Sequence, residues 1–133
     1  MLSDTGFLKA IIDSLEEGIT IQNADGQFVA FNQQALSILE LTHEQMMGNT
    51  SRDPLWAPLA VSGNPLPYDE LATTITRRTG LPQSVTLCLR TGKNNRKWLR
   101  VNTKRINYKN KDYVFASFID TTSTYNEHQQ VKI

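Results

Sequence analysis

The chain of 133 residues is long enough for one domain that buries about two thirds of its unfolded surface. Its 39% hydrophobic and 20% charged residues are typical of a globular protein, and no apolar run approaches the ~20 residues that cross a bilayer. A single cysteine, Cys88, excludes an internal disulfide and suits a reducing compartment, so we expect a cytoplasmic protein.

Positive charge is concentrated in one stretch of the chain. Residues 90–111 contain nine Lys or Arg and no acid, which leaves −8 for the remainder of a chain whose net charge is +1. Such a stretch suits either an anionic partner, such as nucleic acid, or a solvated hairpin with one exposed face. We favour the hairpin and expect neither a nucleic-acid partner nor insertion of this segment into a membrane.

The N-terminal segment, residues 1–17, has the pattern of an amphipathic helix that ends at Gly18. Its apolar residues recur at helical spacing: Phe7, Leu8, Ile11, Ile12 and Leu15. This stripe has to pack either on the sheet of its own chain or on a second copy of the protein. We predict a homodimer with Phe7, Ile11 and Leu15 as contacts.

A hairpin and two short helices follow. Residues 18–22 and 27–31 are β-forming runs, and the Asp25-Gly26 pair between them tolerates the positive φ of a tight turn. Asn32 is suited to cap a helix over residues 33–40. Thr42 and Gln45 have the spacing of a capping box, which predicts a second helix ending at Gly48.

The second half of the chain predicts a crossing segment, one helix and three strands. Residues 49–67 are rich in Pro, Gly, Ser and Asn, and residues 67–79 form a helix that Gly80 ends. Alternating patterns then predict strands over residues 83–90, 98–106 and 113–119. The last strand is apolar on both faces, so it should be central. The fold class is α+β, an antiparallel sheet with short helices on one face.

Several short motifs resemble the PAS domain family in their order and spacing. They are Glu17-Gly18-Ile19-Thr20-Ile21, Asp25-Gly26, Phe31-Asn32, Ala35, Leu39, Leu41, Glu44, Met47-Gly48, Trp98 and Asp120-Thr121-Thr122. Residues 56–82 look like a bacterial PAS subgroup that is attached to signalling enzymes. The resemblance implies a five-stranded sheet of order 2-1-5-4-3 that encloses a small pocket with its helices.

The resemblance also implies a role in signalling. It divides the chain into an N-terminal helix (1–17), a sensory domain (18–122) and the start of an output linker (123–133). The effector that follows would be a diguanylate cyclase or phosphodiesterase of cyclic-di-GMP signalling, or a histidine kinase of a two-component system. Asp120 and Thr122 match the junction that relays the signal. The alternative is a PAS domain with a filled core that serves only dimerisation or partner docking.

The residues argue against an enzyme and against the coloured cofactors of the family. The sequence has no phosphate loop, metal cluster or nucleophile motif, so we expect no catalytic residue and no metal site. Haem-binding relatives supply a histidine from the helix that spans residues 67–79 here, which contains none; His43 and His128 lie elsewhere. The cysteine motif of covalent flavin binding is missing, and Phe118 stands where the flavin-contacting glutamine is expected. We therefore expect a colourless protein, with a small apolar ligand as the possible occupant.

The candidate ligand-binding residues are apolar side chains that the predicted elements turn inward. They are Leu39, Met47, Trp56, Leu71, Ile75, Leu87, Leu89, Leu99, Val101, Thr103 and Phe118. The alternative is that they fill the core, because any core requires such residues. A ligand bound here would be mostly apolar, with polar contacts from Thr103, the Trp56 indole or Gln22.

Overall fold

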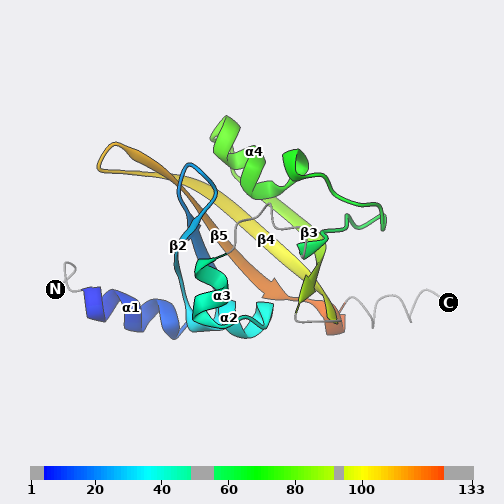
Figure 1. The fold of residues 1–133 in the computed structure, drawn as a ribbon, viewed down its shortest axis with the longest axis horizontal. Coiled ribbons are helices and arrows are strands. Elements are labelled where there is room, and N and C mark those ends of the chain that lie inside the picture. Colours follow the sequence, from blue (N-terminus) through cyan, green and yellow to red (C-terminus); the bar gives the residue numbers. More distant parts are fainter. Residues whose placement is uncertain (1–4, 49–55, 92–94, 125–133) are drawn as a thin grey trace.

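The computed structural model describes residues 5–48, 56–91 and 95–124, and the chain folds around a five-stranded antiparallel sheet of order β2-β1-β5-β4-β3 (Figure 1). The strands are β1 (Gly18–Gln22), β2 (Phe28–Phe31), β3 (Gln83–Thr91), β4 (Asn95–Tyr108) and β5 (Lys111–Asp120). Every pair of neighbouring strands is antiparallel, and β5 is central. The predicted fold class and strand order are confirmed. His128 and most of the predicted output linker lie outside the described residues.

Short helices cover one face of the sheet. They are α2 (Gln33–Leu39), α3 (His43–Met47), the 3₁₀ turn η2 (Tyr68–Glu70) and α4 (Ala72–Thr79). Helix α1 (Thr5–Asp13) lies apart from them, at the β2 side of the sheet (Figure 1). The main apolar core lies between the sheet and these helices, with Ala35, Met46 and Leu99 among its most buried members. Within the described ranges, none of the helices is long and apolar enough to span a membrane.

The helix predicted over residues 67–79 is divided in two. Tyr68–Glu70 forms the 3₁₀ turn, Leu71 is extended with φ −66° and ψ 143°, and α4 begins only at Ala72. Its end is as predicted, because Gly80 adopts the left-handed conformation with φ 76°. The break decides which residues of this segment face the cavity described below: Leu71 and the first turn of α4 line it.

The N-terminal helix is shorter than predicted, and Gly18 does not end it. Helix α1 stops at Asp13, and Gly18 is the first residue of β1, beside Phe118 of β5. A Cβ on Gly18 would lie 2.5 Å from Cε2 of the Phe118 ring. Glycine is therefore required here for the close approach of an aromatic side chain to the backbone.

Asn32 joins three elements at one end of the sheet. Its Oδ1 accepts hydrogen bonds from the backbone N–H groups of Ile19 and Ala35, each at 2.9 Å. Its Nδ2 donates to the backbone oxygens of Ile12 and Glu17, each at 3.0 Å. The side chain is 1% exposed, and both of its polar atoms are satisfied. Asn32, the predicted cap of α2, thus also binds α1 and the segment that connects α1 to β1.

Candidate functional site: a pocket between the sheet and the helices

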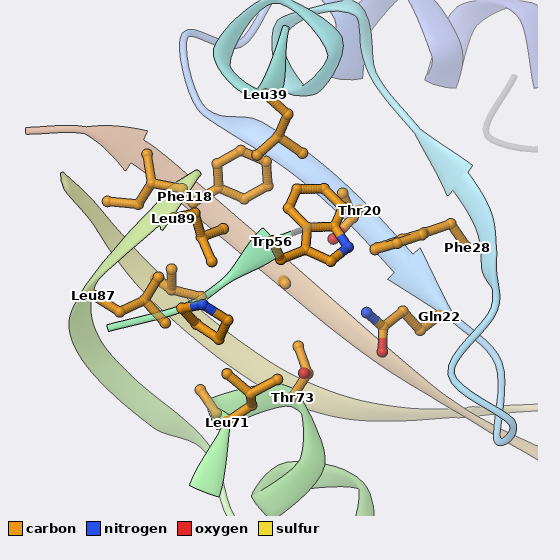
Figure 2. Close-up of a pocket in the computed structure, with 15 residues that line it drawn as sticks. Thr20, Gln22, Phe28, Leu39, Trp56, Leu71, Thr73, Leu87, Leu89 and Phe118 are labelled. Carbon is orange, nitrogen blue, oxygen red and sulfur yellow. The ribbon is translucent and has the colours of Figure 1, made fainter. Parts of the chain in front are cut away.

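The sheet, α4 and the crossing segment surround a cavity of about 100 Å³ (Figure 2). Its lining residues come from β1, β2, β3, β4, β5, α2, α4 and the segment around Trp56: Thr20, Gln22, Phe28, Leu39, Trp56, Pro58, Leu71, Ala72, Thr73, Leu87, Leu89, Leu99, Val101, Ala116 and Phe118. A water molecule needs only about 10–15 Å³ measured in this way. The space therefore suits a molecule larger than water.

Most of the predicted ligand-binding residues line this cavity. They are Leu39, Trp56, Leu71, Leu87, Leu89, Leu99, Val101 and Phe118. The strand residues among them were predictable because each strand alternates between its faces, so Leu87 and Leu89 must point the same way. The Trp56 ring packs at an angle of 57° to Phe28, with 6.4 Å between ring centroids.

Met47 does not line the pocket, so its predicted place there is wrong. The capping box at Thr42 sets the phase of α3 and turns Met46 inward, where it is 0% exposed, while Met47 is 52% exposed. Met47 instead borders a second, outer groove of about 390 Å³ together with Leu8 and Ile12 of α1.

Ile75 and Thr103 are also misplaced in the prediction. Because α4 begins at Ala72, its first turn faces the cavity, and Ile75 lies one turn farther along without lining it. Thr103 is buried, but its hydroxyl contacts the hydroxyl of Thr76 at 2.6 Å and the backbone oxygen of Ala72 at 3.5 Å. It fastens α4 to β4 and is not among the lining residues.

The pocket contains residues that were not on the predicted list. They are Thr20, Gln22, Phe28, Pro58, Ala72, Thr73 and Ala116. Thr20 and Gln22 alternate with Ile19 and Ile21 along β1. If apolar side chains are assumed to face the helices, the two isoleucines are predicted to line the pocket instead of Thr20 and Gln22. The pairing of β1 with β5 shows that Thr20 and Gln22 face the pocket. Thr20 lies beside Ala116 and Gly18 beside Phe118, and both of these β5 residues line the pocket. Of these seven residues, the sequence predicts only Gln22, as a possible polar contact.

The pocket is apolar with a few polar groups. None of the lining residues just named is ionisable, and the polar side chains among them besides the Trp56 indole are Thr20, Gln22 and Thr73. Such a site favours a mostly apolar molecule that is oriented by a small number of hydrogen bonds.

The residues considered for cofactor ligation lie away from the cavity lining. His43 is exposed on α3, with its ring 5.0 Å from that of Phe31. Cys88 is buried on β3 and is not among the lining residues. In the described part of the chain, no group of three or more His, Cys, Asp or Glu residues is arranged to hold a metal ion.

Asp120 and Thr122 lie at the end of β5, next to β4, and both strands contribute residues to the pocket. Oδ1 of Asp120 accepts a hydrogen bond from the N–H of Thr122 at 2.9 Å. The Thr122 hydroxyl accepts one from the N–H of Trp98 at 2.9 Å. Leu99, which follows Trp98, and Phe118, two residues before Asp120, both line the pocket. The chain exit is therefore fastened to pocket-lining strands.

The three predicted dimer contacts are exposed. Phe7, Ile11 and Leu15 are 53%, 43% and 42% exposed, whereas Ile12 turns toward the domain and borders the outer groove. Helix α1 thus packs by one side on its own chain and leaves an apolar stripe on the other.

Comparison with known proteins agrees with this architecture. The family model described as PAS domain matches residues 16–123. No curated protein sequence matches the chain. Among solved structures, the PAS domain of nitrogen regulation protein NR(II) from Vibrio parahaemolyticus has a TM-score of 0.69 at 11% identity, covering 87% of this chain and 99% of that one.

Two further structures are similar in fold. A domain of a sensory box sensor histidine kinase/response regulator from Geobacter sulfurreducens has a TM-score of 0.65 at 13% identity, covering 87% of this chain and 93% of that one. An RNA-binding Light-Oxygen-Voltage receptor has a TM-score of 0.74 at 14% identity, covering 96% of this chain but 36% of that one. At these identities the likeness shows the fold alone.

Proposed function

This chain belongs to the PAS domain family, and from that premise we propose that it is a sensory module that binds a small, mostly apolar ligand in the pocket of Figure 2. The cavity of about 100 Å³ carries the proposal, because the alternative of a filled core leaves no reason for such a space. An engineered cavity of about 150 Å³ in another protein accepts benzene, so a ligand of ring size is the right scale.

We further propose that the signal leaves through the end of β5 to a C-terminal effector, a diguanylate cyclase, phosphodiesterase or histidine kinase. The hydrogen bonds that join Asp120, Thr122 and Trp98 support this route, because they couple the exit to strands that line the pocket. In the natural polypeptide with its effector, Asp120→Ala should weaken the response to stimulus while thermal unfolding of the domain is little changed. A normal response would reduce Asp120 to a turn residue.

A role in association accompanies this proposal. The apolar stripe of Phe7, Ile11 and Leu15 supports a homodimer, since large exposed apolar patches commonly mark contacts. We accordingly assign residues 1–17 to the association segment, 18–122 to the sensory domain and 123–133 to the start of the output linker.

A cavity-filling variant tests the ligand-binding proposal. Ala116 is buried at the pocket wall on β5, and a leucine there would occupy part of the space. Toluene added to the ¹⁵N-labelled wild-type protein should shift the amide resonances of pocket residues, and Ala116→Leu should abolish the effect. Ala24→Leu, in the exposed turn between β1 and β2, is the matched control and should bind toluene as the wild type does. If toluene causes no shift of these resonances in the wild type, the filled-core alternative is favoured.

A further inference from the structure

The polar group of interest is the side-chain amide of Gln22 in the pocket wall. Gln22 is the last residue of β1, is 2% exposed and lines the cavity. Figure 2 shows its amide nitrogen directed toward the interior of the pocket and its oxygen directed toward α4. An amide can present either a donor or an acceptor, so the identity of the inward atom decides which ligands are satisfied.

Arg77 of α4 determines which way this amide is turned. One of its terminal nitrogens, Nη2, donates to Oε1 of Gln22, and the other, Nη1, donates to the Tyr68 hydroxyl at 3.0 Å. A guanidinium has donors and no acceptor, so the atom of Gln22 that faces it must be the oxygen. The amide nitrogen is thereby left for the pocket.

The guanidinium is itself held in place. Besides its two hydrogen bonds, it packs over the β1–β2 turn, where its Nη2 is 3.5 Å from the position of a Cβ on Gly26. A hydrogen bond from a charged donor to the amide oxygen also polarises the amide and strengthens its N–H groups as donors. Gln22 is therefore a fixed and strengthened donor, whereas the hydroxyls of Thr20 and Thr73 can rotate to donate or accept.

We propose that the pocket selects uncharged, mostly apolar ligands that carry a hydrogen-bond acceptor, such as a carbonyl oxygen, and that Arg77 is the positioning residue that imposes this choice. This inference rests on the proposed ligand-binding function. The acceptor binds Nε2 of Gln22. A carboxylate is disfavoured because none of the lining residues is ionisable, so the charge would lose its water without a counter-ion in contact.

Three compounds with a six-membered ring test the proposal, and the first two have nearly equal shape. They are cyclohexanone, which has a carbonyl acceptor, methylenecyclohexane, which lacks it, and cyclohexanecarboxylate, which is charged. Dissociation constants come from NMR titration of pocket resonances in the 133-residue chain. For each variant, the dissociation constants of two compounds are expressed as a ratio. This affinity ratio is compared between variants, so that the different hydrophobicities of the compounds cancel.

Gln22→Leu should weaken the binding of cyclohexanone, relative to that of methylenecyclohexane, by about threefold to tenfold. This is the equivalent of one neutral hydrogen bond. Arg77→Met should reduce the same ratio, because the Gln22 amide is then free to turn. Arg77→Lys still only donates and should preserve the ratio. Arg78→Met is the matched control, since Arg78 is exposed and pairs with Asp69 at 2.9 Å on the surface.

Each outcome has a defined meaning. An unchanged ratio in Gln22→Leu would overturn the acceptor selectivity, and equal ratios in Arg77→Met and Arg77→Lys would overturn the role of Arg77. Tighter binding of cyclohexanecarboxylate than of cyclohexanone would overturn the preference for uncharged ligands. If none of the three compounds binds the wild type, the inference falls together with the proposed ligand-binding function. If they bind with unchanged ratios, only the inference falls.

Discussion

Phe118, an aromatic residue of the pocket wall, occupies its place because the neighbouring strand has a glycine beside it. A methyl group on Gly18 would meet the Phe118 ring at 2.5 Å, a distance that forces the ring to move. We expect Gly18→Ala to lower the free energy of unfolding by about 1–3 kcal/mol, as overpacking does.

Urea-induced unfolding measures this loss. Gly48→Ala is the matched control, because Gly48 has a negative φ of −87° and the nearest atom to its Cβ position is 3.7 Å away. Equal stabilities of the two variants would show that Phe118 is free to move and that Gly18 has no packing role.

Glu40 adds a pH-dependent contribution to stability. Hydrogen bonds from Thr91 and Asn95, together with the charge of Lys97, hold the pKa of Glu40 below its ordinary value of 4.5. Since the pKa is lower in the folded than in the unfolded state, the contribution is present above pH 4.5 and is lost as the pH falls through the folded-state pKa. Glu40→Gln should therefore destabilise the protein near neutral pH, and the difference from the wild type should shrink in acid.

Thermal unfolding at several pH values checks this expectation. Glu44→Gln, at an exposed position of α3, is the control for the loss of one negative charge. A difference between Glu40→Gln and the wild type that does not depend on pH would contradict the assignment.

At the scale of elements, Asn32 connects α1, β1 and α2 by four hydrogen bonds while being almost fully buried. Asn32→Ala leaves two buried backbone N–H groups and two backbone oxygens without this partner. Because an unsatisfied buried polar group costs about 1–3 kcal/mol, we expect a loss of at least about 2 kcal/mol in the free energy of unfolding. Hydrogen exchange should also become faster in α1 and at the start of α2.

Asn102→Ala, on an exposed position of β4, is the control and should change little. If Asn32→Ala destabilises no more than Asn102→Ala, then the four hydrogen bonds do not hold these elements together.

Which elements could be predicted from the sequence depends on how local their signals are. The strands were predictable because alternation and the Asp25-Gly26 turn act over a few residues, whereas the strand order 2-1-5-4-3 was implied by the resemblance to the PAS family. The start of α4 was not, because Pro67 is a good start signal for either a 3₁₀ turn or a helix, and the tertiary position of Leu71 decides between them. Likewise, the orientation of the Gln22 side-chain amide depends on a hydrogen bond from Arg77, which is 55 residues distant in the sequence.

At the scale of the whole molecule, α1 presents Phe7 and Ile11 to the surface, and Leu15, just after the helix, is exposed as well. If two copies pair through this stripe, Phe7→Asp with Ile11→Asp should dissociate the dimer, because each large side chain buried in the contact contributes about 1.5–3 kcal/mol. Sedimentation velocity measures the change. Val61→Asp, at an exposed apolar residue outside α1, is the control and should leave the dimer intact. Unchanged sedimentation of the double variant would rule out this contact.

The central claim is that the pocket is a ligand site, and its most direct test is mass spectrometry of small molecules released from the purified protein. The wild type should release a compound that is uncharged, mostly apolar and of ring size, in near-stoichiometric amount after gentle purification. Ala116→Leu, purified in parallel, should release much less of it, and Ala24→Leu should release as much as the wild type. Equal amounts from the wild type and Ala116→Leu would contradict the claim, because the compound would then be bound outside this pocket.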